Sequence, residues 1–427
     1  MSSETCFLQD VAEVVDSLHK TPRYSECGEP MVRVTDVKYG ELDLSKTFRV
    51  DEGVFAEFSR RYKPSRGDII ITRVGTYGVF AKVLDTNFCL GQNTAAIIPK
   101  TISPDYLYAV LNSEFVKTQI ESSVVGSTQK TLSLKAIKAL QIPRFMPSQE
   151  LAIGSLAAGF DDRITLLRET NTTLEAIAQA LFKSWFVDFD PVHAKMQGRA
   201  PEGMDQATAA LFPDSFEESE LGAVPKGWKW VPLNVAYEIN PPRKLKKGET
   251  APYLDMAGVQ TRGHSVGGVV QREMGSGTKF INGDTLLARI TPCLENGKTA
   301  FVDFLPADTT GWGSTEFVVL RPKDPLPSYH AYLLARHPAF REHAIRSMSG
   351  TSGRQRIQND VLSQFFVTVP PESVGQAFSE LVTVIQTSIN EGHQQAMTLS
   401  ALRDTLLPRL ISGQLRLPEV QAIVESV

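Results

Sequence analysis

The sequence predicts a mixed α/β (α+β) protein in which two similar globular domains are separated by two long antiparallel coiled-coil helices. Three observations lead to this prediction. A chain of 427 residues exceeds a single ordinary hydrophobic core. One stretch carries a long stripe of apolar residues with an average period of 3.5, and the second half of the chain repeats the first. The repeat implies a pseudo-twofold relationship between the two halves.

The first long helix is predicted for residues 149–187. Asn171 lies on its stripe, where it either fixes the helix register inside an apolar seam or lies at the edge of that seam. An average period of 3.5 is typical of a helix that packs along another helix, so we expect a partner of similar length within the chain. The apolar positions alternate in steps of four and three around Asn171: Phe160, Ile164, Leu167, Leu174, Ala178, Leu181 and Trp185.

The second half of the chain repeats the first after about 225 residues. Arg66–Arg73 (RGDIIITR) matches Asn282–Arg289 (NGDTLLAR), and both read as a turn that opens a buried strand. Arg403 is the misfit of the second helix, and we expect its stem to reach toward solvent while Leu402 is buried. In the second helix, the positions that correspond to this stripe are Ile385, Ile389, Gly392, Ala396, Leu399, Arg403, Leu406 and Leu410.

These patterns divide the chain into six segments. The connector is rich in glycine, proline and acidic residues, so we expect at most short helical pieces in it. The segments are a first domain (1–148), the first helix (149–187), the connector (188–225), a second domain (226–371), the second helix (372–412) and a tail (413–427).

Composition excludes several classes of protein. A hydrophobic content of 42% and a charged content of 22% fit a soluble globular chain. No stretch approaches the ~18 apolar residues that a membrane helix needs, and the N-terminus lacks the basic region of a signal peptide. The four cysteines are scattered without metal-ligand spacing, which favours a reducing cytoplasm. The net charge of −4 does not favour nucleic acid by itself, but basic residues cluster locally.

No catalytic or metal site is predicted. Asn240–Arg243 resembles the Asn-Pro-Pro-aromatic loop of adenine methyltransferases, but arginine replaces the aromatic residue that must stack on the base. Gly297–Thr299 resembles the end of a phosphate loop, yet Pro292 occupies the first glycine position and the surroundings indicate a hairpin turn. The Asp188–His193 stretch has too few ligands for a metal, and we expect its aromatic residues to pack on the domain.

Two similar globules at a fixed separation suit a ligand with two recognition elements, and duplex DNA is such a ligand. Each globule carries a polar, glycine-led loop at a matching position, although a solvated turn is the alternative for either loop alone. Gln can read adenine, Arg can read guanine, and Ser, Thr and Lys can hold phosphates. The candidate DNA-binding residues are Ser127, Thr128, Gln129 and Lys130 in the first loop, and Thr351, Ser352, Arg354, Gln355 and Arg356 in the second.

Over essentially its whole length the chain resembles the specificity subunit of type I restriction-modification enzymes. Four stretches carry the resemblance in combination, and none would suffice alone. They are Leu181–Phe189 (LFKSWFVDF), Leu221–Trp228 (LGAVPKGW), Arg289–Lys298 (RITPCLENGK) and Leu406–Gly413 (LLPRLISG).

The resemblance implies two target recognition domains, each reading one half of a bipartite, asymmetric DNA sequence, with the helices setting the spacer. Two methyltransferase subunits would use S-adenosylmethionine, and restriction (motor-nuclease) subunits would use ATP and Mg; no cofactor is expected in this chain. A protein–protein adaptor of the same shape that binds no DNA is the main alternative. The specificity subunit of a methylation-only complex is a narrower one.

By position in this family, further residues are expected at the DNA. They are the strand-end arginines Arg73 and Arg289, together with Asn296 and Lys298. For the two arginines the alternative is a structural role, tying the strand end to Asp68 or Asp284. Methyltransferase contacts are expected on the outward faces of the helices and on the aromatic residues Phe182, Trp185 and Phe186, for which burial in the core is the alternative.

Overall fold

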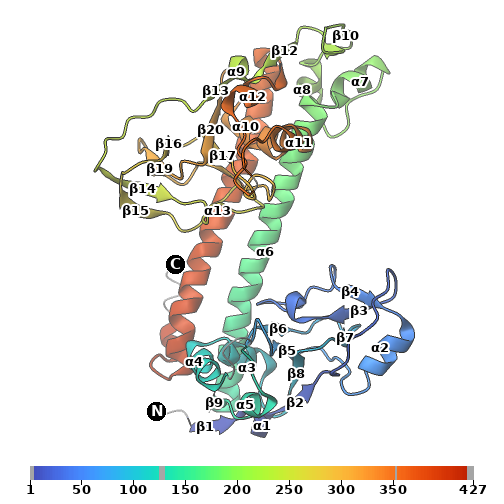
Figure 1. Ribbon diagram of the computed structural model, residues 1–427, viewed down its shortest axis with the longest axis vertical. Coiled ribbons are helices and arrows are strands. Elements are labelled where there is room, and N and C mark those ends of the chain that lie inside the picture. Colours follow the sequence, from blue (N-terminus) through green and yellow to red (C-terminus); the bar gives the residue numbers. More distant parts are fainter. Residues whose placement is uncertain (1–3, 125–129, 352, 421–427) are drawn as a thin grey trace. The chain divides into compact units, whose positions relative to one another are not determined.

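The computed structural model describes residues 4–124, 130–351 and 353–420 and divides into two compact units (Figure 1). Unit 1 consists of Met1–Leu166 with Ala396–Val427, and unit 2 is Leu167–Gln395. Each unit combines sheets with short helices and includes part of both long helices. This content confirms the predicted fold class. Among the described residues, no helix combines the length and the apolar character that crossing a bilayer requires.

Unit 1 is built on an antiparallel sheet in the order β2-β8-β5-β6. Its second sheet has the order β4-β3-β7, and β1 pairs with β9 in a separate ribbon. The strands are β1 Glu4–Phe7, β2 Ala12–Asp16, β3 Glu29–Val32, β4 Phe48–Val50, β5 Ile69–Thr72, β6 Phe80–Lys82, β7 Cys89–Leu90, β8 Thr94–Pro99 and β9 Gln141–Arg144. The short helices are α1 Leu8–Val11, η1 Val34–Asp36, α2 Glu52–Phe58, α3 Pro104–Leu111, α4 Glu114–Ser123 and α5 Leu134–Lys138.

Unit 2 repeats these connections with the orders β13-β20-β17-β18 and β15-β14-β19-β16, and with the ribbon β12-β21. Its strands are β12 Lys229–Pro232, β13 Tyr237–Ile239, β14 Thr250–Leu254, β15 Val270–Glu273, β16 Thr278–Phe280, β17 Thr285–Ala288, β18 Thr299–Phe301, β19 Gly311–Gly313, β20 Phe317–Pro322 and β21 Phe366–Val369. Its helices are α9 Leu233–Ala236, α10 Ser328–Arg336, α11 Pro338–Arg346 and α12 Asn359–Ser363. The connector holds α7 Asp190–Met196, α8 Gln206–Ala210, β10 Phe216–Glu217 and β11 Val224–Pro225.

The two copies of the Gly-Asp motif open equivalent buried strands, β5 and β17, each beside an antiparallel partner. The expected hairpin turn near Gly297 joins β17 to β18. After β8 the chain forms two helices, α3 and α4. Ser113 separates them, and its side chain accepts from the Val116 amide and so caps α4.

The long helices are α6 Pro147–Phe186 and α13 Glu372–Ile411, each 40 residues long. Within each unit the two helices run antiparallel. In unit 1 Phe160 packs with Leu406 and Leu410. In unit 2 the Asn171 side-chain amide donates to the Ile389 carbonyl at 2.9 Å, so Asn171 is bonded across the seam. The 3.5 period therefore identifies helix pairing correctly.

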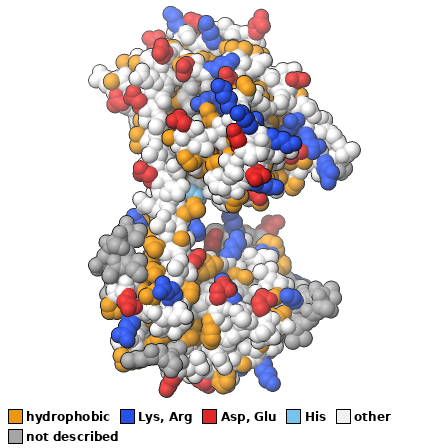
Figure 2. Space-filling view, turned by 90° about the vertical axis from the view of Figure 1, so that its left-hand side faces the viewer, with side chains coloured by type: hydrophobic (Ala, Val, Ile, Leu, Met, Phe, Trp, Pro, Cys, Tyr) orange, Lys and Arg blue, Asp and Glu red, His pale blue; other side chains and the backbone are white. Residues whose placement is uncertain are grey.

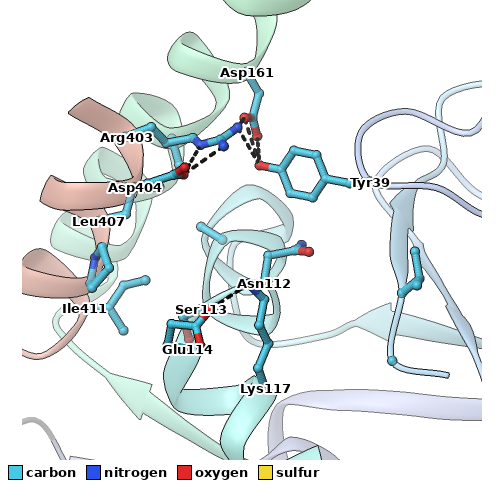
Figure 3. Close-up of a pocket in the computed structure, with 15 residues that line it drawn as sticks. Tyr39, Asn112, Ser113, Glu114, Lys117, Asp161, Arg403, Asp404, Leu407 and Ile411 are labelled. Atoms are coloured by element: carbon cyan, nitrogen blue, oxygen red, sulfur yellow. Dashed lines mark hydrogen bonds and ion pairs between the residues drawn. The ribbon is translucent and has the colours of Figure 1, made fainter. Parts of the chain in front are cut away.

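Arg403 does not reach toward solvent as its sequence context suggested. In unit 1 its Nη1 lies 2.7 Å from Asp161 Oδ1 and 3.1 Å from the Tyr39 hydroxyl, which donates to Asp161 at 2.9 Å. Figure 3 shows the three side chains pointing toward one another at the edge of a pocket. Burial, reinforced by the Asp161 charge, raises the pKa of Tyr39 well above its usual value, so its hydroxyl stays a donor.

Candidate nucleic-acid interface

In unit 1 the predicted loop is attached to the end of β5. The Leu132 amide donates to the Arg73 carbonyl at 2.8 Å, and the Gly75 amide donates to the Lys130 carbonyl at 3.3 Å. The Arg73 Nε also donates to the Leu132 carbonyl at 3.3 Å. Arg73 and this loop, which are far apart in the sequence, are therefore one structural feature.

Unit 2 uses the same attachment. The Ile357 amide donates to the Arg289 carbonyl at 3.0 Å, and the Thr291 amide donates to the Gln355 carbonyl at 3.0 Å. Arg289 Nη2 donates to the Ile357 carbonyl at 2.9 Å. Two loops of different sequence are thus held at the same strand end in the same way.

The strand-end arginines hold these loops in place. Arg73 is only 8% exposed and forms an ion pair with Asp16, so it does not face solvent as a DNA contact would. Arg289 is half-buried and bonded to the loop backbone. The contacts of Arg73 and Arg289 thus agree with a structural role for these arginines. The expected partners, Asp68 and Asp284, are however bonded to other residues. Asp68 accepts from Tyr62 and Ser65, and Asp284 pairs with Arg243 and Arg321.

Among the candidate residues of these loops that the structure describes, Lys130, Thr351 and Arg354 are exposed. The Lys130 ammonium lies 3.3 Å from the Tyr77 hydroxyl, which steadies it at the loop end. Gln355 is half-buried, and its backbone amide donates to the Thr291 hydroxyl at 3.1 Å. Four of the predicted residues, Ser127, Thr128, Gln129 and Ser352, lie outside the described residues.

Arg356 is held in a two-pronged ion pair with Glu316. Its Nε and Nη2 lie 2.9 and 2.6 Å from the two carboxylate oxygens. This hydrogen bonding holds the pKa of Glu316 below its usual range. Arg356 is therefore paired with Glu316 of unit 2, and its contact with DNA bases stays a prediction.

The loop between β17 and β18 carries two candidate DNA-binding residues, Asn296 and Lys298, which differ in exposure. Asn296 is exposed. Lys298 is half-buried and its Nζ donates to the Met256 carbonyl at 2.6 Å, so its charge is engaged within unit 2. Of this pair, Asn296 has the free side chain.

A groove that sequence reasoning did not identify lies beside these residues in unit 2. Its volume is about 460 Å³, and its basic lining residues are Arg243, Lys279 and Arg289. The Asn240–Arg243 stretch, which resembles a catalytic loop, forms one wall. Its Asn240 Oδ1 accepts from the Val319 amide, which is a structural contact. Figure 2 shows a group of Lys and Arg side chains on the visible face of unit 2.

The aromatic residues proposed for partner binding belong to the core of unit 2. Phe182, Trp185 and Phe186 are 2–4% exposed. Trp185 and Phe186 pack on Phe378, Phe186 also packs on Trp228, and Phe182 stacks on Phe186. Because they have almost no free surface, they cannot form an outer docking face, and the core alternative describes them correctly.

Comparisons with known proteins match this architecture. A family model described as the type I restriction modification DNA specificity domain matches residues 2–176. The MjaIX type I specificity subunit of Methanocaldococcus jannaschii is 24% identical over 97% of this chain and 93% of its own length. The chain is thus similar, over nearly its whole length, to a type I restriction enzyme specificity subunit.

Two further proteins extend the comparison. The HindI type I specificity subunit of Haemophilus influenzae is 25% identical to this protein over 82% of this chain and 87% of its own length. The crystal structure of the S subunit of a type I restriction-modification system from M. genitalium has the same fold, with a TM-score of 0.56. It is 14% identical and the match covers 95% of both chains. Among the described residues of the chain, no group of three or more His, Cys, Asp or Glu could hold a metal ion.

Proposed function

We propose that this specificity subunit recognises a bipartite, asymmetric DNA sequence, with residues 1–148 reading one half and residues 226–371 the other. The observation that carries the proposal is the repeated loop attachment. Main-chain hydrogen bonds hold residues 130–132 and 355–357 to the ends of β5 and β17 in the same pattern, while their side chains differ. A constant frame with variable loops is suited to two different half-sites.

The exposed side chains supply the chemistry of the proposed contacts. Lys130 and Thr351 can hold phosphates, and Arg354 can donate two hydrogen bonds to guanine in the major groove. Asn296 can read adenine by donating one hydrogen bond to N7 and accepting one from N6. Ser127, Thr128, Gln129 and Ser352 remain part of the proposal through their sequence positions.

We further propose that the helices 149–187 and 372–412 set the spacer and bind partner subunits. The partners are two methyltransferase subunits, which would use S-adenosylmethionine, and restriction subunits, which would use ATP and Mg. Large apolar side chains that are 44–68% exposed on the two helices support a protein partner there. They are Leu151, Leu166, Ile177, Leu381, Val384 and Met397.

Sequencing of methylated bases tests DNA recognition against the adaptor alternative. This specificity subunit is co-expressed with its methyltransferase in a host that lacks other adenine methylation. We expect methylated adenine in one bipartite motif with a fixed spacer. The control is the methyltransferase without this chain. Methylation that is absent, or that has the same motif without this chain, would reject recognition by the specificity subunit.

A further inference from the structure

The basic groove of unit 2 gathers three positive charges around one opening of about 460 Å³. Its cations are Arg243, Lys279 and Arg289, and none of the described residues that line it is Asp or Glu. Lys279 is half-buried, and its ammonium donates to the Leu245 carbonyl at 2.6 Å, which is a neutral partner. Charges of one sign that line a concave surface attract ions of the other sign, so the groove favours anions.

The two strand-end arginines differ in their acidic partners. In unit 1 Arg73 forms an ion pair with Asp16, the last residue of β2. Arg289 takes the same place in unit 2, and its Nη2 donates to the neutral Ile357 carbonyl. Arg289 thus holds its loop without the carboxylate that accompanies Arg73.

Strand pairing shows why this carboxylate is missing from unit 2. Val14 of β2 and Ile239 of β13 each lie opposite the third-last residue of the strand with which they pair, β8 and β20. Two positions further along the chain, unit 1 has Asp16 and unit 2 has Pro241. Pro241 lines the groove together with Arg289. Unit 2 therefore keeps the arginine of unit 1 and has lost its acidic partner.

The acidic residues next to the groove are bonded to other cations. Asp284 accepts from both Arg243 and Arg321, so one carboxylate serves two guanidinium groups. Glu316 is paired with Arg356. Among the described residues, the other two cations of the groove have no carboxylate partner. Partly buried charges without a counterion are unfavourable, and an anion in the groove relieves this cost.

We propose that the groove binds a phosphate group through Lys279 and Arg289, in the role that the Asp16 carboxylate has in unit 1. Phosphate oxygens accept charge-assisted hydrogen bonds from ammonium and guanidinium groups as carboxylates do. The DNA backbone and a free phosphate compound share this chemistry. The DNA source rests on the proposed function, because Arg289 also holds the loop that is proposed to read a half-site. Such a contact positions the DNA without reading its sequence.

Titration of the full-length chain with inorganic phosphate tests the site. Sodium chloride at the same ionic strength is the reference, and the amide NMR signal of Thr315, an exposed groove residue, is followed after labelling with 15N-threonine. Thr315→Ser identifies this signal. We expect a saturable shift with a Kd of about 10 mM or tighter, in the range that two charge-assisted hydrogen bonds support. A signal that does not respond to phosphate, or responds equally to chloride, would overturn the proposal.

Two variants change the charge of the groove. Lys279→Gln removes one positive charge, and Pro241→Asp restores the carboxylate of unit 1. Each should weaken phosphate binding at least about fivefold. The same substitutions at exposed positions outside the groove, Lys229→Gln and Pro371→Asp, should leave it unchanged. If Pro241→Asp fails to fold, Lys279→Gln still decides, and undiminished phosphate binding by that variant would contradict the assignment.

The salt dependence of DNA binding distinguishes the two sources of the phosphate. It is measured with the methyltransferase complex of the unchanged chain and of Lys279→Gln. A dependence reduced by about one ion in Lys279→Gln assigns the groove to the DNA backbone. An unchanged dependence, with weaker binding of inorganic phosphate, assigns it to a free phosphate compound. Inorganic phosphate binds without DNA, so failure of this proposal is separate from failure of DNA recognition, which the methylated motif of the unchanged chain reports.

Discussion

Asn171 and Gly392 face each other across the two long helices of unit 2. A Cβ on Gly392 would lie 2.6 Å from Asn171 Oδ1, and the Asn171 amide donates to the Ile389 carbonyl at 2.9 Å. The asparagine therefore fits because residue 392 has no side chain. This relationship favours the interpretation that Asn171 fixes register over the alternative of an edge position.

Coupling between these residues can be measured with a double-mutant cycle. Gly392→Ala should gain up to about 1 kcal/mol of helix propensity but displace Asn171 from its hydrogen bond, which is worth about 1 kcal/mol. In an Asn171→Ala background only the gain remains. We therefore expect Gly392→Ala to be neutral or destabilising alone and stabilising in that background, in urea unfolding. Additive effects would show that the two side chains do not interact.

The Arg403–Asp161 pair should be important for stability of unit 1. The two side chains are 17% and 12% exposed, so removing one leaves a poorly solvated charge. We expect Arg403→Ala or Asp161→Ala to lower the free energy of unfolding by about 3 kcal/mol. Arg403→Met combined with Asp161→Leu should recover much of this loss. Lys117→Ala at the same pocket, whose ion pair with Glu114 is exposed, is the control and should cost under about 1 kcal/mol. A small effect of the single variants would refute a structural role for the pair.

The exposed loop residues should differ from the buried ones in their effect on DNA binding. Arg354→Ala should weaken binding to the cognate site by about 1–3 kcal/mol and relax specificity in one half-site. Lys130→Ala should weaken binding to all sequences and reduce the salt dependence by about one ion. Competition binding at several salt concentrations measures both effects. Loss of specificity in the other half-site would contradict the assignment of this loop to residues 226–371.

The buried His330 predicts pH dependence of unit 2. Its pKa is lowered from 6.5 to about 3 by burial, so the unfolded chain binds the proton more readily than the folded chain. Stability is therefore complete above the unfolded pKa and is lost as pH falls below it. We expect this group to contribute roughly 1–2 kcal/mol to the loss between pH 7 and 5. His330→Asn should reduce that loss in thermal unfolding, and an unchanged pH dependence would show that His330 does not titrate on unfolding.

The sequence predicts those parts of the fold that depend on local pattern. The Gly-Asp motifs identify β5 and β17, and a 3.5 period identifies α6 and its pairing. It does not predict contacts between distant residues. Asp16 lies 57 positions from Arg73, and no periodicity links them.

The placement of the aromatic residues near the end of α6 illustrates the same limit. Their spacing reports a helix face but not what covers it. Phe212 of the connector and Trp228 close over Trp185 and Phe186, and this burial depends on tertiary packing. The exposed apolar residues of the helices, such as Val384, lie off the predicted stripe, so the stripe does not identify them individually.

Exchange of one domain tests the central claim most directly. Residues 1–148 are replaced by the corresponding domain of another specificity subunit, and the methylated motif is determined by sequencing methylated bases. The account predicts that one half of the bipartite motif changes while the other half and the spacer stay the same. A change in both halves, or in neither, would contradict the claim that each domain reads its own half-site.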